Sequence, residues 1–205
     1  MGTVGSLMMP SLTSAETPKA RTMSTDFDSQ RLVKQVTGVG PWVVYQDPTA
    51  ALGFTFEYPE NWAAGTETGR DQPYWQLIIL GPRNAANTWS AGLTVRALPT
   101  TGLYHSLEQL IETRRTSSAS APQFQWLDEG SRPVGALQTW QMAWTHVVPL
   151  PPHSLQATPT PIQTRLVIFA VGDHLYELSY TADAREYPAY QHVFDHLLHT
   201  LTIAK

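Results

Sequence analysis

Residues 165–181 read RLVIFAVGDHLYELSYT, and this stretch decides the fold class. Before the Gly172-Asp173 pair, alternate positions place Val167, Phe169 and Val171 on one face; after it, Tyr176, Leu178 and Tyr180 share a face. A period of two is typical of a half-buried β-strand. Gly-Asp suits a tight two-residue turn. The pattern therefore predicts a hairpin that pairs 166–171 with 174–180.

A helix is predicted immediately after this hairpin. Pro188 suits a first helical turn, where its missing N–H would be unpaired in any case. Apolar residues then recur at helical spacing, and we expect Phe194, Leu197 and Leu201 to be buried on the sheet with Val193 and Leu198 beside them.

Upstream, further strands and one more helix are expected. The strands cover 42–46, 54–58, 75–80, 92–98, 124–132 and 136–148, and a proline-rich loop is expected over 149–161. Ser106 and Gln109 form the pattern of a capping box, so a helix should start there and fade over 116–118. Tight hairpins with interspersed helices predict an α+β domain, a central, mostly antiparallel sheet layered with helices.

The composition limits the classes of function. The chain has 205 residues, of which 42% are hydrophobic and 15% charged, with a net charge of −4 and no cysteine. We expect a flexible N-terminal tail over 1–40 and one domain over 41–205. The acidic balance disfavours nucleic acid as a partner, and no apolar run is long enough for membrane insertion. The absence of cysteine excludes disulfides and thiolate chemistry.

The search for chemical motifs yields one weak candidate site. Phosphate loops, nucleophile elbows and zinc-protease signatures are absent from the sequence. His192, His196 and His199 are spaced i, i+4 and i+7 on the predicted last helix, a stripe that we expect to face solvent. Two imidazoles one turn apart can chelate zinc or copper. A solvated polar face explains the same pattern, so we expect no bound metal and no cofactor.

Three positions are candidates for protein binding. Trp89 lies among polar residues in a connection between strands, and an exposed tryptophan is a typical interface anchor. Pro151 and Pro152 lie in the proline-rich segment, which a partner could recognise in an extended form or which simply stiffens a connection. The stripe formed by Trp140, Met142 and Trp144 is instead expected to belong to the core.

Two segments resemble the PsbP-like domain family, which has the Mog1/PsbP fold. The first is Asp47-Pro48 followed by GFTFEYP at 53–59 and Trp62; the second is the closing hairpin, the helix after it and Leu201-Thr202-Ile203. The resemblance covers about residues 42–205. It implies an α/β/α sandwich around an antiparallel sheet and a non-enzymatic accessory protein. Several members attach to photosystem II or assist its assembly.

The leading hypothesis is therefore a non-catalytic accessory or assembly protein that binds a larger protein complex, including a membrane-associated complex such as photosystem II. The first alternative is a small-ligand or metal-binding module that uses the histidine stripe. The second is a hydrolase whose site is dispersed along the sequence. The N-terminus has no signal-peptide pattern, so the chain as written is expected in the cytoplasm. A processed form would belong to the thylakoid lumen or the periplasm.

Overall fold

The computed structural model describes residues 38–46, 53–68, 74–83 and 91–203. The expected tail over 1–40 lies almost entirely outside these residues. The described elements, in chain order, are β1 (Trp42–Gln46), β2 (Phe54–Pro59), β3 (Ala63–Thr68), β4 (Trp75–Leu80), β5 (Ala91–Pro99), α1 (Leu107–Ala119), β6 (Gln125–Val134), β7 (Leu137–Leu150), β8 (Thr158–Val171), β9 (His174–Asp183), α2 (Tyr187–Thr200) and β10 (Thr202–Ile203).

The closing hairpin forms as predicted. β8 and β9 pair antiparallel from Ile162↔Asp183 to Val171↔His174, so the turn consists of Gly172 and Asp173. Gly172 has φ +59°, a conformation that L side chains rarely adopt and glycine reaches without strain. The dipeptide therefore sets the register of the two longest-range elements of the sheet.

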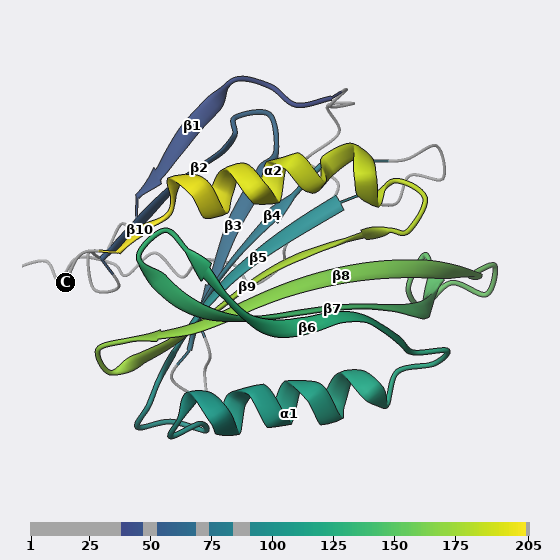
Figure 1. The fold of residues 1–205 in the computed structure, drawn as a ribbon. Helices are drawn as coiled ribbons and strands as arrows, with labels where there is room; N and C mark the ends of the chain where they lie inside the picture. Colours follow the sequence, from purple (N-terminus) through teal and green to yellow (C-terminus); the bar gives the residue numbers. More distant parts are fainter. Residues whose placement is uncertain (1–37, 47–52, 69–73, 84–90, 204–205) are drawn as a thin grey trace, which may run out of the picture. The chain divides into compact units, whose positions relative to one another are not determined.

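The strands form two antiparallel sheets. The larger has seven strands in the order β3-β4-β5-β9-β8-β7-β6, and the smaller has three in the order β1-β2-β10. Figure 1 shows α2 above one face of the larger sheet and α1 below the other. The described domain is therefore an α+β sandwich around an antiparallel sheet, with the small sheet added on the α2 side.

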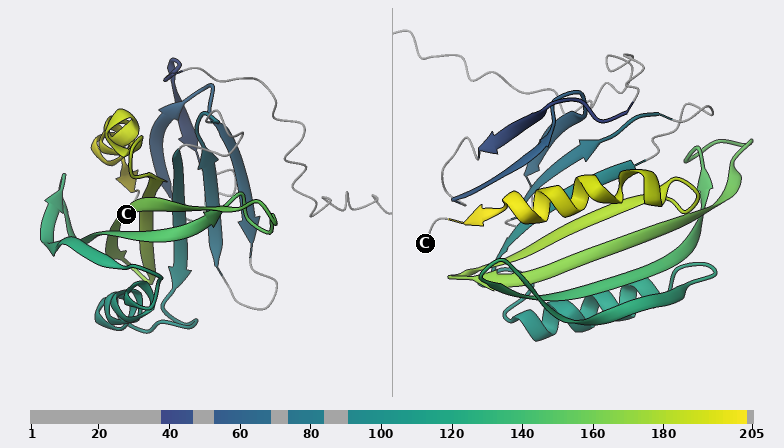
Figure 2. Two further views of the ribbon diagram at one scale, coloured as in Figure 1. Left: turned by 90° about the vertical axis from the view of Figure 1, so that its right-hand side faces the viewer. Right: turned by 45° about the horizontal axis from the view of Figure 1, so that its top comes forward.

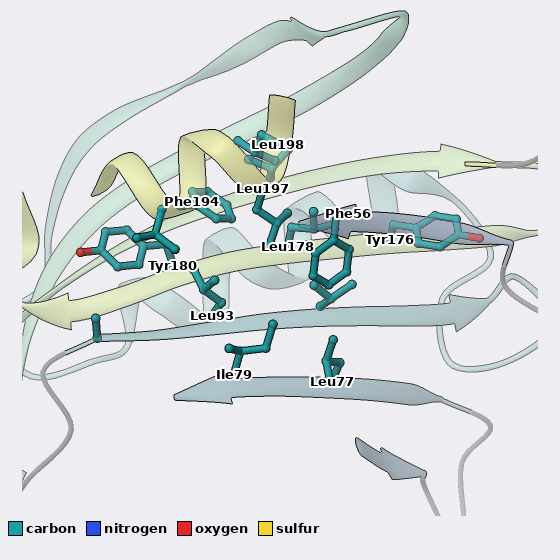
Figure 3. Close-up of a cluster of buried hydrophobic side chains, with 14 of the residues drawn as sticks. Phe56, Leu77, Ile79, Leu93, Tyr176, Leu178, Tyr180, Phe194, Leu197 and Leu198 are labelled. Atoms are coloured by element: carbon teal, nitrogen blue, oxygen red, sulfur yellow. The ribbon is translucent and has the colours of Figure 1, made fainter. Parts of the chain in front are cut away.

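The main hydrophobic core fills the space between α2, β2 and the large sheet. Phe194 and Leu197 are fully buried, as predicted, whereas Leu201 is half-buried and packs at the margin of this core. Figure 3 shows the helix residues pointing onto the side chains of β4, β5 and β9. The alternating residues of those strands supply the facing layer: Leu77, Ile79, Leu93, Val95, Tyr176, Leu178 and Tyr180.

A second core lies under α1. Leu110 of the helix is fully buried against Met142, Leu166 and Ile168, and the predicted Trp140–Trp144 stripe belongs here, with Trp144 buried and Trp140 half-buried. Because consecutive strand residues point to opposite faces, β8 supplies Leu166 and Ile168 to this core and Val167 and Phe169 to the other.

The start of α1 differs in one detail from a capping box. The Ser106 hydroxyl accepts a hydrogen bond from the backbone N–H of Gln109 at 3.2 Å, as expected for an N-cap. The Gln109 side chain accepts its bond from the N–H of His105 (2.9 Å) instead of from Ser106. The helix also continues through the 116–118 segment to Ala119, so the prediction that it fades there is wrong.

Three other expectations differ from the structure. Strand β3 and the two-residue strand β10 were not predicted. The proline-rich loop is shorter than expected, since β7 continues to Leu150 and β8 begins at Thr158. Proline is compatible with a strand wherever its missing N–H would point away from the pairing partner, which is why these strands tolerate it.

Candidate functional site

A two-stranded arm is the most prominent surface feature of the described residues. β6 pairs with β7 as far as Gln125↔Thr145, and β9 pairs with β8 as far as Asp183↔Ile162. Beyond these points β7 and β8 pair only with each other, from Val147↔Pro161 to Leu150↔Thr158. We call residues 147–161 the β7–β8 arm. Figure 2 shows this hairpin extending past its neighbouring strands.

The arm is exposed and uncharged. Pro151 and Pro152, the predicted interface residues, lie at its tip and are both exposed, and Leu155 is fully exposed at 107% relative accessibility. The sequence contains no Asp, Glu, Lys or Arg between Arg132 and Arg165. The structure thus combines in one projection the residues that could contact a partner through apolar surface.

Two hydrogen bonds attach the base of the arm to the rest of the domain. The Val147 N–H donates to the carbonyl of Pro122 at 2.9 Å, and the Ala184 N–H donates to the carbonyl of Pro161 at 2.9 Å. The first ties β7 to the segment after α1, and the second ties β8 to the turn after β9. These contacts orient the arm relative to the sheet, although the arm itself lacks neighbouring strands.

Trp89, the other predicted anchor, lies outside the described residues. The structure therefore does not place it relative to the arm.

The three histidines do not behave as one solvent-facing stripe. His192 and His199 are exposed on α2, as expected. The His196 ring stacks on the Trp42 ring at 3.8 Å between centroids, and its Nε2 lies 2.7 Å from Oε2 of Glu57. The expectation for this residue was wrong because Trp42 and Glu57, on strands far away in the sequence, fold against the helix.

Glu57 joins β2 to α2 in a second way. Its backbone N–H donates to the Thr200 hydroxyl at 3.0 Å, while its carboxylate accepts from His196. His196 is therefore already engaged as a cross-link between the small sheet and the helix. Among the described residues there is no group of three or more His, Asp or Glu side chains arranged to hold a metal ion.

A row of polar side chains crosses the sheet on the α1 side. Glu67, Gln76, Arg96 and Glu177 lie directly opposite one another on β3, β4, β5 and β9. Arg114 of α1 completes what we call the polar ladder. The Arg96 Nε donates to Gln76 Oε1 at 2.8 Å, and Arg96 and Arg114 both contact the buried Glu177 carboxylate.

The polar ladder holds α1 on the sheet rather than presenting a reactive group. The Arg114 Nη2 lies 2.7 Å from Glu177 Oε2, and this hydrogen bond raises the pKa of the Arg114 guanidinium above its ordinary value. The guanidinium also lies over the Tyr104 ring, 5.5 Å from its centroid. Arg96 and Glu177 interrupt otherwise apolar strands, so a polar residue in a strand interior was the sequence signal for this cluster.

The fold of the chain is shared with known structures. No protein-family model matches the sequence, and a comparison with curated proteins finds no match. Cyanobacterial PsbP (CyanoP) from Synechocystis sp. PCC 6803 aligns over 82% of this chain and 95% of its own, with 12% identity and a TM-score of 0.50. The Ran-binding protein Mog1p of Saccharomyces cerevisiae aligns over 80% and 96%, with 9% identity and a TM-score of 0.49; a Mog1 mutant gives 0.50.

A protein of Bacteroides thetaiotaomicron also matches, over 79% of this chain with 16% identity and a TM-score of 0.49, and there the chain spans about half (48%) of the matched length. The described domain therefore has the Mog1/PsbP-like fold, as the resemblance of 53–59 and of the closing hairpin indicated. No helix within the described ranges is long and apolar enough to cross a membrane.

Proposed function

We propose that this protein is a non-catalytic accessory or assembly factor that binds a larger protein complex. The observation that carries the proposal is the β7–β8 arm, a projection with exposed Pro151, Pro152 and Leu155. An isolated two-stranded ribbon is marginally stable in water. A domain that maintains such a ribbon, free of charge and apolar at its tip, has a surface suited to contact with another protein.

The ionisable side chains of the described residues support the same proposal. The acidic and basic groups that are most buried are engaged with each other: Glu177 with two arginines and Asp183 with Arg185. His196 is bonded to Glu57 in the same way. General acid–base catalysis needs titratable groups that converge on a space for substrate. Here these groups instead connect elements of the fold.

The identity of the complex is the part of the proposal to be tested by isolation. The full-length chain, tagged at its C-terminus and expressed in its source organism, should retain a multi-protein complex through washing. A variant in which residues 150–159 are replaced by an Asn-Gly turn should lose that complex and keep its circular dichroism spectrum. Co-migration with photosystem II would identify a photosystem factor. Loss of nothing on arm removal, or turnover of a substrate by the isolated chain, would contradict the proposal.

Trp89 is a second proposed contact, on the basis of its sequence surroundings alone. If it is an interface anchor, Trp89→Ala should weaken capture of the same complex by the equivalent of about 2 kcal/mol. Its melting temperature should stay close to that of the unmodified chain. Trp144→Ala is the control, because Trp144 is buried in the second core and its loss should lower the melting temperature.

A further inference from the structure

The arm has a backbone property that restricts how a partner can bind it; this inference rests on the proposed function. In an antiparallel pair, residues alternate between pairs that exchange two N–H···O bonds and pairs whose N–H and C=O groups point outward. Proline has no N–H. The Pro149↔Pro159 pair and the Val147↔Pro161 pair are therefore the outward-pointing pairs of the arm.

As a consequence, the strand portions of the arm offer no free outward N–H. Three of the four outward positions are prolines: Pro149, Pro159 and Pro161. The fourth, Val147, already donates its N–H to Pro122. A strand of a partner that added to either edge would find carbonyl acceptors and no donors. Strand addition depends on both, so the arm is closed to that mode of binding.

The same prolines form an apolar surface. Residues at alternate positions of paired strands share a face, so Pro149, Pro159 and Pro161 lie together on one side of the arm, and all three are exposed. We call this surface the proline face. It continues into the exposed tip with Pro151, Pro152 and Leu155. Proline side chains have little conformational freedom to lose, which lowers the entropic cost of binding.

We infer that the arm binds through its side chains, with the proline face and Leu155 seated in an uncharged, aromatic-lined groove of a protein partner. Aromatic rings are enriched in the centres of protein interfaces, and proline rings dock against aromatic-lined grooves in other recognition systems. A groove of this kind complements a segment that has no Asp, Glu, Lys or Arg. It also leaves no buried charge without a partner.

A lipid surface fits the arm less well. Segments that lie at a membrane interface combine several large apolar side chains with Trp, Tyr, Lys or Arg at the headgroup level. The tip has a single fully exposed large apolar residue, Leu155, and the arm contains no aromatic or basic residue apart from His153. The surface is therefore better matched to a shaped protein groove than to a bilayer.

Paired substitutions separate the two modes of protein binding. In Pro149→Thr/Pro159→Thr, both strands keep good strand-forming residues and gain outward N–H donors. Binding to the complex isolated with the wild-type chain should weaken at least about tenfold, because the rings are lost. Binding that is equal or stronger would mean strand addition and would overturn the inference. Leu155→Ser should weaken binding similarly, whereas Leu103→Ser, at the other strongly exposed leucine outside strand and helix, should not.

Three more readouts test the chemistry of the partner surface. Affinity should change less than about threefold between about 0.05 and 0.5 M salt, since no ion pair is involved. A photo-crosslinker at position 155 should attach to a partner peptide that contains aromatic residues, and one at position 173, in the turn of the other hairpin, should not. Binding to neutral or anionic lipid vesicles that is lost in Leu155→Ser would overturn the inference. If the wild-type chain retains no complex, the proposed function fails as well; if arm variants retain it fully, only this inference fails.

Discussion

Glu177 of β9 accepts a hydrogen bond from Arg114 of α1, with Nη2 at 2.7 Å from Oε2, inside the interface between the helix and the sheet. The Glu177 side chain is 5% exposed and the Arg114 side chain 22%. Arg96, on the neighbouring strand, contacts the same carboxylate. The pairing is therefore a buried contact whose loss would leave one charge in an interface without its partner.

Removing one partner of this pair should destabilise the domain. We expect Arg114→Ala to lower the free energy of unfolding by about 3 kcal/mol, because it leaves the Glu177 carboxylate buried with a weaker contact to Arg96. Urea unfolding followed by tryptophan fluorescence measures this change. Arg132→Ala is the control: Arg132 pairs with Asp128 at the surface, and its loss should cost less than about 1 kcal/mol.

The double variant Arg114→Met/Glu177→Leu extends this test. Replacing both charges with apolar side chains removes the desolvation penalty together with the attraction. It should be more stable than Arg114→Ala. A double variant as unstable as the single one would indicate that the ladder is needed as a whole.

The turn of the closing hairpin should be sensitive to the loss of glycine. Gly172→Ala forces a β-carbon into a conformation with φ +59°, and we expect a loss of about 1 kcal/mol even though no atom lies within 4 Å of the new carbon. Gly130→Ala is the matched control, since that site is equally open and has no positive φ. Equal stabilities of the two variants in thermal unfolding would contradict this account of the turn.

The histidines of α2 should not hold a metal ion. Chelation by His192 and His196 would require His196 to leave Glu57 and the Trp42 ring. Protein isolated without a metal-affinity column should contain much less than stoichiometric zinc or copper by elemental analysis. Stoichiometric metal that is lost in His192→Ala/His196→Ala would show this prediction to be wrong.

His146 should make the stability of the domain depend on pH. Burial lowers the pKa of its imidazole below the ordinary 6.5, and its Nδ1 has no hydrogen-bond partner. The unfolded chain therefore binds this proton more readily than the folded domain, so stability should fall as the pH drops through and below that value. In His146→Leu the decline between about pH 7 and pH 5 should be smaller, as measured by chemical unfolding at each pH.

The acidic groups act in a different range of pH. Hydrogen bonds from Arg185 lower the pKa of the Asp183 carboxyl below its ordinary 3.8, so its contribution to stability is present above that value and is lost only at lower pH. A His146→Leu variant whose stability follows the same curve as the unmodified chain between pH 7 and pH 5 would exclude the histidine as the cause.

Local pattern was sufficient for most elements of this fold. The alternation around Gly172-Asp173 specified the closing hairpin and its register, because a shift of one residue would turn Phe169 and Tyr176 to the other face. The apolar spacing of Phe194 and Leu197 likewise specified the buried side of α2. Strand β3 gave no such signal, because its sequence AAGTET has no large apolar residue to alternate.

The sequence by itself determined the class of fold, the caps and turns, and the apolar faces of both helices, since these depend on neighbours within a few positions along the chain. Only the tertiary structure decided which polar groups meet. His196 finds Glu57 across 139 positions and Arg114 finds Glu177 across 63. It also decided that a proline-rich segment is a paired arm, because the exposure of Pro149 and Pro159 depends on where the neighbouring strands end. Such contacts follow from long-range packing, which local periodicity does not record.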